Sequence, residues 1–241
     1  MREHAPGVDA HGDVEQLHDL RVAVRRVRAL LRLAPPIGDD RAKSLRDEFG
    51  ALGRALGPAR DADVFAAYLR TATADLEEDG FERLFERVES ERLEAYGVAR
   101  AALDDAGFPL LLQSLDAFTQ SVENGDHSLH DVVDGQATKL RKSMRDVSTD
   151  AALHRARIQA KRLRYTAEAA GDEQTIERVK RFQDFAGEHQ DAVVAESRLR
   201  ELVEPETAVL VGRLIERQAL RRQRARRRTL KAWKRLAKTT K

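Results

Sequence analysis

Apolar residues recur every three or four positions along most of this 241-residue chain, which is the spacing of amphipathic helices. The alternation that marks strands is nearly absent, and Ala, Leu, Arg and Glu dominate the composition. The pattern therefore predicts an all-α protein. The expected helices span residues 14–33, 39–56, 61–79, 81–105, 109–122, 130–147, 150–170, 174–186, 191–203 and 206–238.

Several of the predicted helix ends have a local cause in the sequence. The two prolines at residues 35–36 should end the first helix, because proline lacks the amide that a helix interior needs. Gly57 and Gly187 should end the second helix of each half of the chain. Asp61 and Asp191 are the expected N-caps of the helices that follow, since a carboxylate there can accept from exposed amides.

A basic signature occurs twice in the chain, first as His-x-x-Arg-x-x-x-Arg-Arg-x-Arg and then as His-x-x-Arg-x-x-x-Lys-Arg-x-Arg. Each residue of an α-helix turns about 100°, so the first, fourth, eighth and eleventh positions lie within roughly 80° of one another. Each copy therefore predicts a column of one histidine and three permanent cations along one helix face. The columns consist of His18, Arg21, Arg25 and Arg28 in the first copy and of His154, Arg157, Lys161 and Arg164 in the second.

An apolar stripe adjoins each column, which gives each helix a packing face beside a cationic face and places the cations at the mouth of a groove or cavity. No acidic residue lies between Arg21 and Arg32 or between His154 and Arg164. Stacked cations repel one another by roughly 0.2–0.5 kcal/mol per pair, so two such columns favour a polyanionic ligand over the alternative of a solvated surface. The stripes consist of Leu17, Leu20, Val24, Val27 and Leu31, and of Leu153, Ala156, Ala160, Leu163 and Ala167.

Further similarity between the two parts of the chain indicates an internal duplication. The first basic signature begins at His18 and the second at His154, and segment 57–64 is similar to segment 187–194. The two signatures lie slightly farther apart in the chain than the two segments do. A longer loop near residues 35–38 would account for the difference.

This duplication predicts two packed half-bundles, because its period is far too long for a solenoid repeat. The expected organisation is a single domain that follows a disordered N-terminus. The domain covers residues 14–240, its halves cover residues 14–124 and 128–240, the seam lies near residues 122–128, and the disordered N-terminus covers residues 1–13.

The net charge of +2 conceals a strong asymmetry along the chain. Residues 211–241 hold thirteen Lys or Arg against one acid, whereas the rest of the chain holds thirty against forty. An acidic exterior would repel generic polyanions from most of the surface and concentrate one at the basic faces. The last helix carries a third basic column, for which a solvated or frayed basic tail is the alternative interpretation; it consists of Arg213, Arg217, Arg221 and either Arg224 or Arg228.

The composition argues against several classes of protein. The chain contains no cysteine, which rules out disulfides and thiolate metal sites, and its 5% of aromatic residues argues against a base-stacking platform. The N-terminus shows no secretory signal, and no run of eighteen apolar residues predicts a membrane span. A cytoplasmic protein without membrane association is therefore expected.

Three motif fragments fall short of enzyme sites. The His18-Asp19 dipeptide, which occurs in some metal-dependent hydrolases, is not repeated in the second copy of the signature. Glu15 and His18 have the spacing of a di-iron ligand pair, but the second copy lacks the glutamate. The motif Gly-x-x-Gly-x-x-x-Gly at residues 50–57 lacks the lysine and hydroxyl of a phosphate-binding loop. We therefore expect no catalysis, no metal and no cofactor.

The basic signatures, together with Leu-Gly-x-x-Arg-Asp-x-Asp-Val at residues 56–64, closely resemble the CHAD family, named for a conserved histidine α-helical domain. The resemblance rests on residues 18–28, 56–64, 154–165 and 180–191, in the family's order and spacing, and covers essentially residues 14–240. It implies two four-helix bundles related by a pseudo-two-fold axis, with basic residues lining a central groove or pore.

The same resemblance implies a function. CHAD domains are non-catalytic modules that bind inorganic polyphosphate and can direct proteins to polyphosphate granules. Many relatives also carry a triphosphate-processing CYTH domain, for which this chain has no room, so it resembles the standalone form.

The resemblance places the polyphosphate contacts on the eight residues of the two columns. A second set of basic residues is expected to contribute more weakly, and Lys180 belongs to this set although Gly50 stands at its counterpart position. Arg60 is expected to form a structural ion pair with Asp61 and Asp63. The second set consists of Arg26, Arg32, Arg162, Lys180, Arg213, Arg217 and Arg221.

Two alternative functions remain open at this point. One is a general polyanion or nucleic-acid binder that depends mainly on residues 211–241, and the other is a scaffold whose basic columns dock an acidic protein partner. Nucleic acid is expected to bind more weakly than polyphosphate, because aromatic residues for base stacking are scarce.

Overall fold

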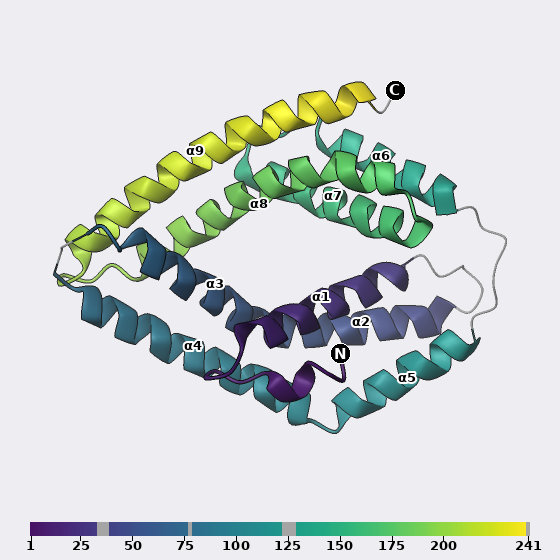
Figure 1. Ribbon diagram of the computed structural model, residues 1–241, viewed down its shortest axis with the longest axis horizontal. Coiled ribbons are helices and arrows are strands. Elements are labelled where there is room, and N and C mark those ends of the chain that lie inside the picture. Colours follow the sequence, from purple (N-terminus) through teal and green to yellow (C-terminus); the bar gives the residue numbers. More distant parts are fainter. Residues whose placement is uncertain (33–38, 77–78, 122–128, 240–241) are drawn as a thin grey trace. The chain divides into compact units, whose positions relative to one another are not determined.

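The computed structural model describes residues 1–32, 39–76, 79–121 and 129–239 (Figure 1). These residues form helices and no strand, so the prediction of an all-α protein is confirmed. The predicted loop at residues 35–38 and the predicted seam at residues 122–128 lie outside the described residues. The elements are η1 (Ala5–Gly7), α1 (Val14–Leu30), α2 (Asp39–Ala55), α3 (Gly57–Ala72), α4 (Phe81–Asp104), α5 (Gly107–Ser121), α6 (Leu129–Ser143), α7 (Asp150–Ala170), α8 (Glu173–Glu201) and α9 (Ala208–Thr239).

The helices divide into two compact units by their internal packing. Unit 1 contains α1 to α5, and unit 2 contains α6 to α9. Each unit has its own cluster of buried apolar side chains.

The core of unit 1 is built on the apolar stripe of α1. Leu17, Leu20 and Val24 are at most 1% exposed, and they belong to one cluster with Phe49 of α2 and Tyr96 of α4. The predicted packing face of α1 is therefore confirmed. Its burial fixes which side of the helix turns toward the neighbouring helices and which residues lie at the edge of that contact.

The expectation of a disordered N-terminus at residues 1–13 is wrong in the structure. The short helix η1 leads into this core, where Ala5 and Val8 are buried. Arg100 of α4 donates to the carbonyl of Ala5 at 3.0 Å, and His4 contacts the Gln16 side chain at 3.2 Å. Polar anchors from two helices thus hold a segment that its composition alone marks as unstructured.

The core of unit 2 follows the same principle on α7. Phe182 of α8 and Trp233 of α9 pack edge to face there, with ring centroids 5.9 Å apart. Ridges from three helices thus meet at the stripe, whose burial was predicted from the sequence. The buried residues that α7 contributes are Ala152, Leu153, Ala156, Ala160, Leu163, Thr166 and Ala167.

Helix α8 is continuous from Glu173 to Glu201, whereas the sequence predicted two helices interrupted at Gly187. A helix-interior glycine costs roughly 1 kcal/mol relative to alanine, which is too little to break a helix whose packing continues on both sides. Buried Ala186 and Ala192 supply that packing. Asp191 therefore lies inside the helix and is not an N-cap.

Asp61 is not an N-cap either, because α3 already begins at Gly57. Pro58 in the first turn explains this start, since its missing amide would have no partner in that turn. The Gly57-Pro58 pair therefore starts a helix in addition to following the end of the previous one.

Helix α9 is part of the core of unit 2, and the interpretation of residues 211–241 as a solvated or frayed tail is wrong for the described part. Ala225 and Thr229 are fully buried, and Ala232 and Leu236 are 7% and 9% exposed. In Figure 1, α9 runs along α8, with which it makes the most extensive helix pairing of the unit.

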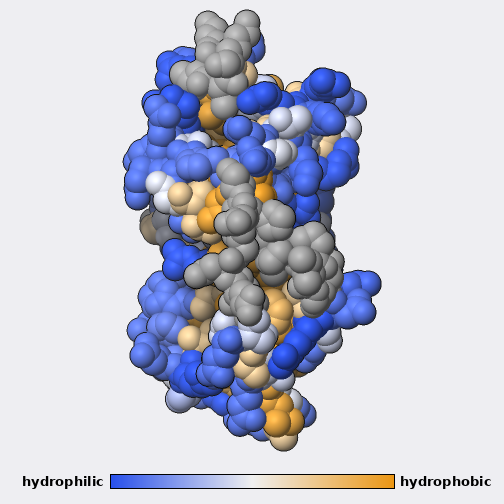
Figure 2. All heavy atoms as spheres, turned by 90° about the vertical axis from the view of Figure 1, so that its right-hand side faces the viewer, coloured by the Kyte–Doolittle hydropathy of each residue, from blue (hydrophilic) through white to orange (hydrophobic). Residues whose placement is uncertain are grey.

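Hydrophilic residues cover most of the face shown in Figure 2, and apolar residues appear there in smaller areas between them. Among the described helices, none combines the length and apolarity that a membrane crossing requires.

Candidate functional site

Helix α1 presents the first basic column at the edge of its packing face. Its N-terminus is capped by Asp13, whose side chain accepts from the amide of Glu15 at 2.9 Å. The column residues lie next to the buried stripe, and for this reason all of them are only partly exposed. The half-buried residues are His18, Arg21, Arg25 and Arg28.

Helix α7 presents the second column in the same way. Thr149 caps its N-terminus by accepting from the amide of Ala152, and Gly171 ends it in the left-handed conformation at φ 67°. All four column residues are again half-buried: His154, Arg157, Lys161 and Arg164.

Arg21 is a largely enclosed cation within unit 1. Its side chain is 17% exposed, and its Nε and Nη1 atoms are buried without a hydrogen-bond partner. Its Nη2 lies 3.8 Å from Asp61, whose own side chain is 72% exposed. Burial lowers the pKa of Arg21 against the raising effect of Asp61, and the positive charges of Arg25 and Arg60 lower it further.

The absence of acids within each signature suggested columns without acidic neighbours, but each column has one nearby. Arg21 has the distant approach to Asp61, and Arg164 pairs with Glu168 at 3.2 Å one helical turn later. Both carboxylates lie outside the sequence windows that were free of acids. His154 contacts the side chain of Gln190 at 2.7 Å.

The two columns differ in the charge around their histidines. Side-chain atoms of Glu15, His18 and Asp19 lie within 4.8 Å of one another on α1. In the second copy, the positions of Glu15 and Asp19 are taken by Ala151 and Arg155. The N-terminal end of the α7 column is therefore the more positive of the two.

The residues of the second basic set lie on or directly after four helices and differ in exposure. Arg162 and Arg221 are half-buried, and Arg162 Nη1 contacts Gln159 at 3.4 Å. The remaining members of the set are exposed: Arg26 on α1, Arg32 just after it, Lys180 on α8, and Arg213 and Arg217 on α9.

The family model of the CHAD domain matches residues 1–200 of the chain. The chain belongs to the CHAD family. CHAD domains are associated with polyphosphate-related proteins and are in general non-catalytic binding domains.

Two relatives of this CHAD chain are the uncharacterized proteins MT2285 and Rv2226 of Mycobacterium tuberculosis, from strains CDC 1551 and H37Rv. Each is 32% identical over 204 residues, which covers 77% of this chain. The chain spans about two fifths of the length of these relatives, because the match covers 40% of each.

Two solved structures share the fold. The crystal structure of the CHAD domain from the plant Ricinus communis has a TM-score of 0.74 and 26% identity, and the match covers 92% of this chain and 81% of that one. PptA from Streptomyces chartreusis has a TM-score of 0.76 over 97% of this chain and 96% of its own. Its identity is 18%, so the likeness to PptA concerns the fold alone.

The predicted ion pair of Arg60 with Asp61 and Asp63 in this CHAD domain is wrong. Asp63 is buried, and it accepts from Arg92 at 3.2 Å and from the Tyr96 hydroxyl at 2.8 Å. Burial and the hydrogen bond to Asp63 raise the pKa of Tyr96. Both partners come from α4, so the sequence around Arg60 gave no sign of them.

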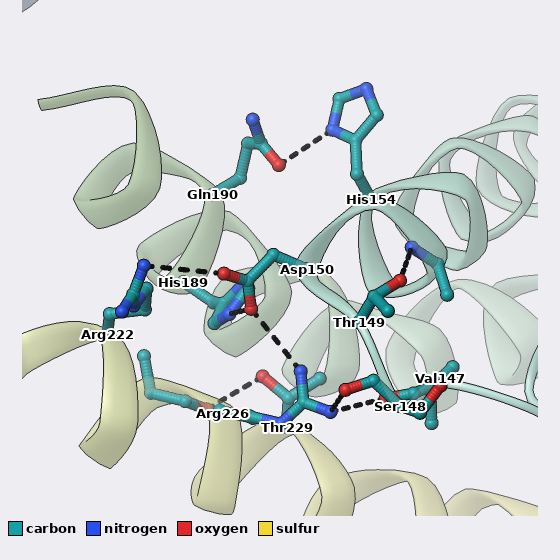
Figure 3. A network of polar contacts seen from close by, with 12 residues as sticks. Val147, Ser148, Thr149, Asp150, His154, His189, Gln190, Arg222, Arg226 and Thr229 are labelled. Atoms are coloured by element: carbon teal, nitrogen blue, oxygen red, sulfur yellow. Dashed lines mark hydrogen bonds and ion pairs between the residues drawn. The ribbon is translucent and has the colours of Figure 1, made fainter. Parts of the chain in front are cut away.

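A second polar network, absent from the sequence predictions, joins α7, α8 and α9 (Figure 3). Asp150 at the start of α7 contacts His189 at 3.0 Å, Arg226 at 3.4 Å and Arg222 at 3.5 Å. Arg222 also reaches buried Glu196 at 3.2 Å. Burial is the main cause that lowers the pKa of His189, against the raising effect of Asp150.

Arginines of α9 therefore hold unit 2 together. Arg226 donates to the backbone carbonyls of Val147 and Ser148, at the end of the connection that precedes α7 (Figure 3). Arg228 pairs with Glu188 at 2.9 Å and lies 4.3 Å from the ring centre of Phe185. The sequence signal that could have suggested this role is the acidic content of α8 opposite the basic run.

Proposed function

We propose that this CHAD domain binds inorganic polyphosphate through the basic faces of α1 and α7 and catalyses no reaction. The observation that carries the proposal is the state of Arg21. Two of its three guanidinium nitrogens are buried without an acceptor, and the third has only a distant, exposed carboxylate. A buried unsatisfied donor costs about 1–3 kcal/mol, and an anion whose oxygens reached these nitrogens would supply the missing acceptors.

Polyphosphate suits such a column chemically. Each phosphate carries about one negative charge and several acceptor oxygens, and the planar guanidinium of arginine can donate to two oxygens at once. Lys161 adds a mobile point charge to the second column. Half-buried cations lie in a lower effective dielectric than exposed ones, so their attraction for a phosphate is stronger.

Nucleic acid fits the two faces less well. Helix α1 contains no aromatic residue, and α7 contains only Tyr165. Large aromatic side chains elsewhere, such as Phe49 and Phe182, are fully buried in the cores. Bases would therefore find no stacking platform on these faces, which favours a ligand made of phosphates alone.

We further propose a cytoplasmic location at polyphosphate granules.

A competition titration tests the choice of ligand. Long-chain polyphosphate, duplex DNA and single-stranded RNA are compared at equal phosphate concentration and equal salt. We expect polyphosphate to bind most tightly. With the six permanent cations of the columns engaged, log K should fall with log salt at a slope of about −4, and of about −5.6 when both histidines are also charged. Equal or tighter binding of RNA would contradict the proposal.

Charge reversal tests the two faces. The pair Arg21→Glu and Arg25→Glu, and separately the pair Arg157→Glu and Lys161→Glu, should each lower the affinity about 10–100-fold. Exposed residues outside the columns provide controls with the same change in net charge. These controls are Arg41→Glu with Lys43→Glu in unit 1, and Lys139→Glu with Lys142→Glu on α6 in unit 2.

The controls also separate local contact from general charge. A loss in the controls as large as in the column variants would favour a general polyanion binder. A loss from the reversal in only one of the two columns would restrict the binding site to that unit.

A further inference from the structure

Three glycines of unit 1 lie against the basic column of α1. We call Gly50, Gly53 and Gly57 the glycine track; the first two are in α2, and the third begins α3. A Cβ atom added at Gly57 would lie 3.1 Å from Nη1 of Arg21, and one added at Gly50 would lie 3.3 Å from Nη2 of Arg28. These separations are shorter than ordinary van der Waals contact. Two guanidinium groups therefore occupy the space that side chains at Gly50 and Gly57 would need.

The backbone does not require glycine at these positions. Among the described residues, positive φ occurs only at Gly80 and Gly171, so the track glycines have ordinary helical conformations. Glycine disfavours a helix relative to alanine, which makes two glycines within α2 a disadvantage for that helix. Helix formation therefore does not explain the glycines at these positions, whereas the close approach of the α1 side chains does.

The middle glycine of the track, Gly53, lies against an apolar side chain of α1. Val24, which lies between the two arginines on α1, is 3.5 Å from the position of a Cβ at Gly53, an ordinary packing distance. Arg21 and Arg28 are thus held on either side of a buried apolar contact. Val24 itself belongs to the buried core cluster of unit 1.

We propose that the glycine track is a positioning device that holds Arg21 and Arg28 against the backbone of α2 and α3. This inference rests on the proposed function, because the device sets the guanidinium groups of the α1 column in place before the polyanion arrives. A ligand then loses less side-chain entropy when it binds. The three glycines touch no ligand themselves and act through the two arginines.

Unit 2 lacks most of this device. When segment 187–194 is aligned with segment 57–64, the positions that correspond to the track hold Lys180, Gln183 and Gly187. Gln183 instead uses its amide to donate to the carbonyl of Ala160 at 2.6 Å. A Cβ at Gly187 would lie 3.7 Å from Nη2 of Arg157, which is ordinary contact. Alanine should therefore be tolerated at Gly187 but should displace a guanidinium group at Gly57.

The test compares alanine at track glycines with alanine at other helical glycines. Gly50→Ala and Gly57→Ala are made singly and together, and Gly187→Ala is the variant that the geometry predicts to be harmless. Gly97→Ala in α4 and Gly135→Ala in α6 are matched controls, because an added Cβ at either site meets nothing within 4 Å.

Two quantities are measured for each variant: the dissociation constant for long-chain polyphosphate and the melting temperature. We expect the controls and Gly187→Ala to change the dissociation constant by less than about twofold and to raise the melting temperature slightly. The double track variant should lower the affinity about 5–10-fold without lowering the melting temperature, because a displaced guanidinium end costs the fold little.

A measurement without ligand separates this inference from the proposed function. The NMR signals of the arginine Nε–H groups report whether a guanidinium is held, and Arg21→Lys and Arg28→Lys identify the two signals. We expect slow solvent exchange at both sites in the wild type and fast exchange in the double track variant, with the Gly97→Ala control unchanged.

The outcomes divide cleanly. Unchanged exchange of both signals in the double track variant would overturn the positioning role, whatever the ligand. An affinity that stays the same or rises in that variant would also overturn it. If the double track variant loses this protection but the wild-type protein binds no polyphosphate, the positioning role stands and the proposed function is refuted.

Discussion

Replacing Arg21 with methionine should make the free protein more stable and should weaken its binding of polyphosphate. Methionine keeps a long, flexible apolar side chain in the half-buried position and removes the charge and the donors. The structure gives the terms of the balance. Nε and Nη1 of Arg21 are buried without acceptors, and the nearest carboxylate is Asp61 at 3.8 Å.

The magnitudes favour a net gain in stability. Removing buried donors without partners relieves about 1–3 kcal/mol, and loss of an exposed ion pair costs about 0–1 kcal/mol. Relief of repulsion from Arg25 adds a few tenths, roughly 0.2–0.5 kcal/mol. We therefore expect a net stabilisation of about 1–2 kcal/mol, which for a chain of this size raises the melting temperature by about 2–8 °C.

The affinity should change in the opposite direction. A charge-assisted hydrogen bond contributes about 1.5–3 kcal/mol, so its loss should weaken polyphosphate binding about 10–100-fold. Thermal unfolding with and without polyphosphate measures both effects on one sample. The control is Arg41→Met, which removes one positive charge from an exposed position on α2 and should leave both quantities nearly unchanged.

Two results would refute this reasoning. A lower melting temperature of the free Arg21→Met protein would mean that Arg21 serves the fold, as Arg226 does in unit 2. An affinity loss no larger than that of Arg41→Met would mean that Arg21 contributes only long-range charge.

Three further predictions concern the fold itself. Burial lowers the pKa of His189 below its usual value near 6.5, so the unfolded chain takes up a proton before the folded protein does as the pH falls. The stability of the folded state is therefore complete above about pH 6.5 and declines below it. Because His189→Gln removes this titrating group, it should reduce the drop in melting temperature between pH 7.5 and 5.5. Asp63→Asn should lower the free energy of unfolding by about 2–4 kcal/mol in urea titration, because Arg92 loses its buried carboxylate and keeps only Glu89 and a carbonyl. Deleting residues 225–239 should unfold unit 2, seen as a loss of helical circular dichroism well beyond the deleted residues, since that segment supplies buried core side chains.

The parts of the fold that follow from local periodicity could be predicted from the sequence. The stripes of α1 and α7 are buried as their spacing indicated, and these stripes place the two basic columns at the edge of each contact. The error at Gly187 has a physical reason. Sequence shows a residue that weakens a helix, but only the tertiary packing of Phe182 and Ala192 shows that the helix continues.

Contacts between distant segments could not be predicted. The partner of Asp63 lies 29 residues away on α4, and Asp150 meets an arginine of α9 that follows it by 76 residues. The order of the N-terminus depends on Arg100, which donates to a carbonyl 95 residues before it. None of these pairings leaves a periodic signal, because each depends on how whole helices pack.

The arginines of this chain show why charge alone does not identify the ligand-binding surface. On α9, Arg222, Arg226 and Arg228 meet carboxylates, carbonyls and an aromatic ring, so their positive charge is already matched within unit 2. On α1, the Arg21 side chain is less exposed than any of these three, yet its buried Nε and Nη1 donors have no acceptor. The basic run of residues 211–241 is the stronger signal in the sequence, but the structure uses Arg222, Arg226 and Arg228 to join α9 to its neighbours. An argument for nucleic acid that rests on this run therefore cannot count these three cations, whereas the smaller cluster on α1 keeps charge for which an external anion is the natural partner.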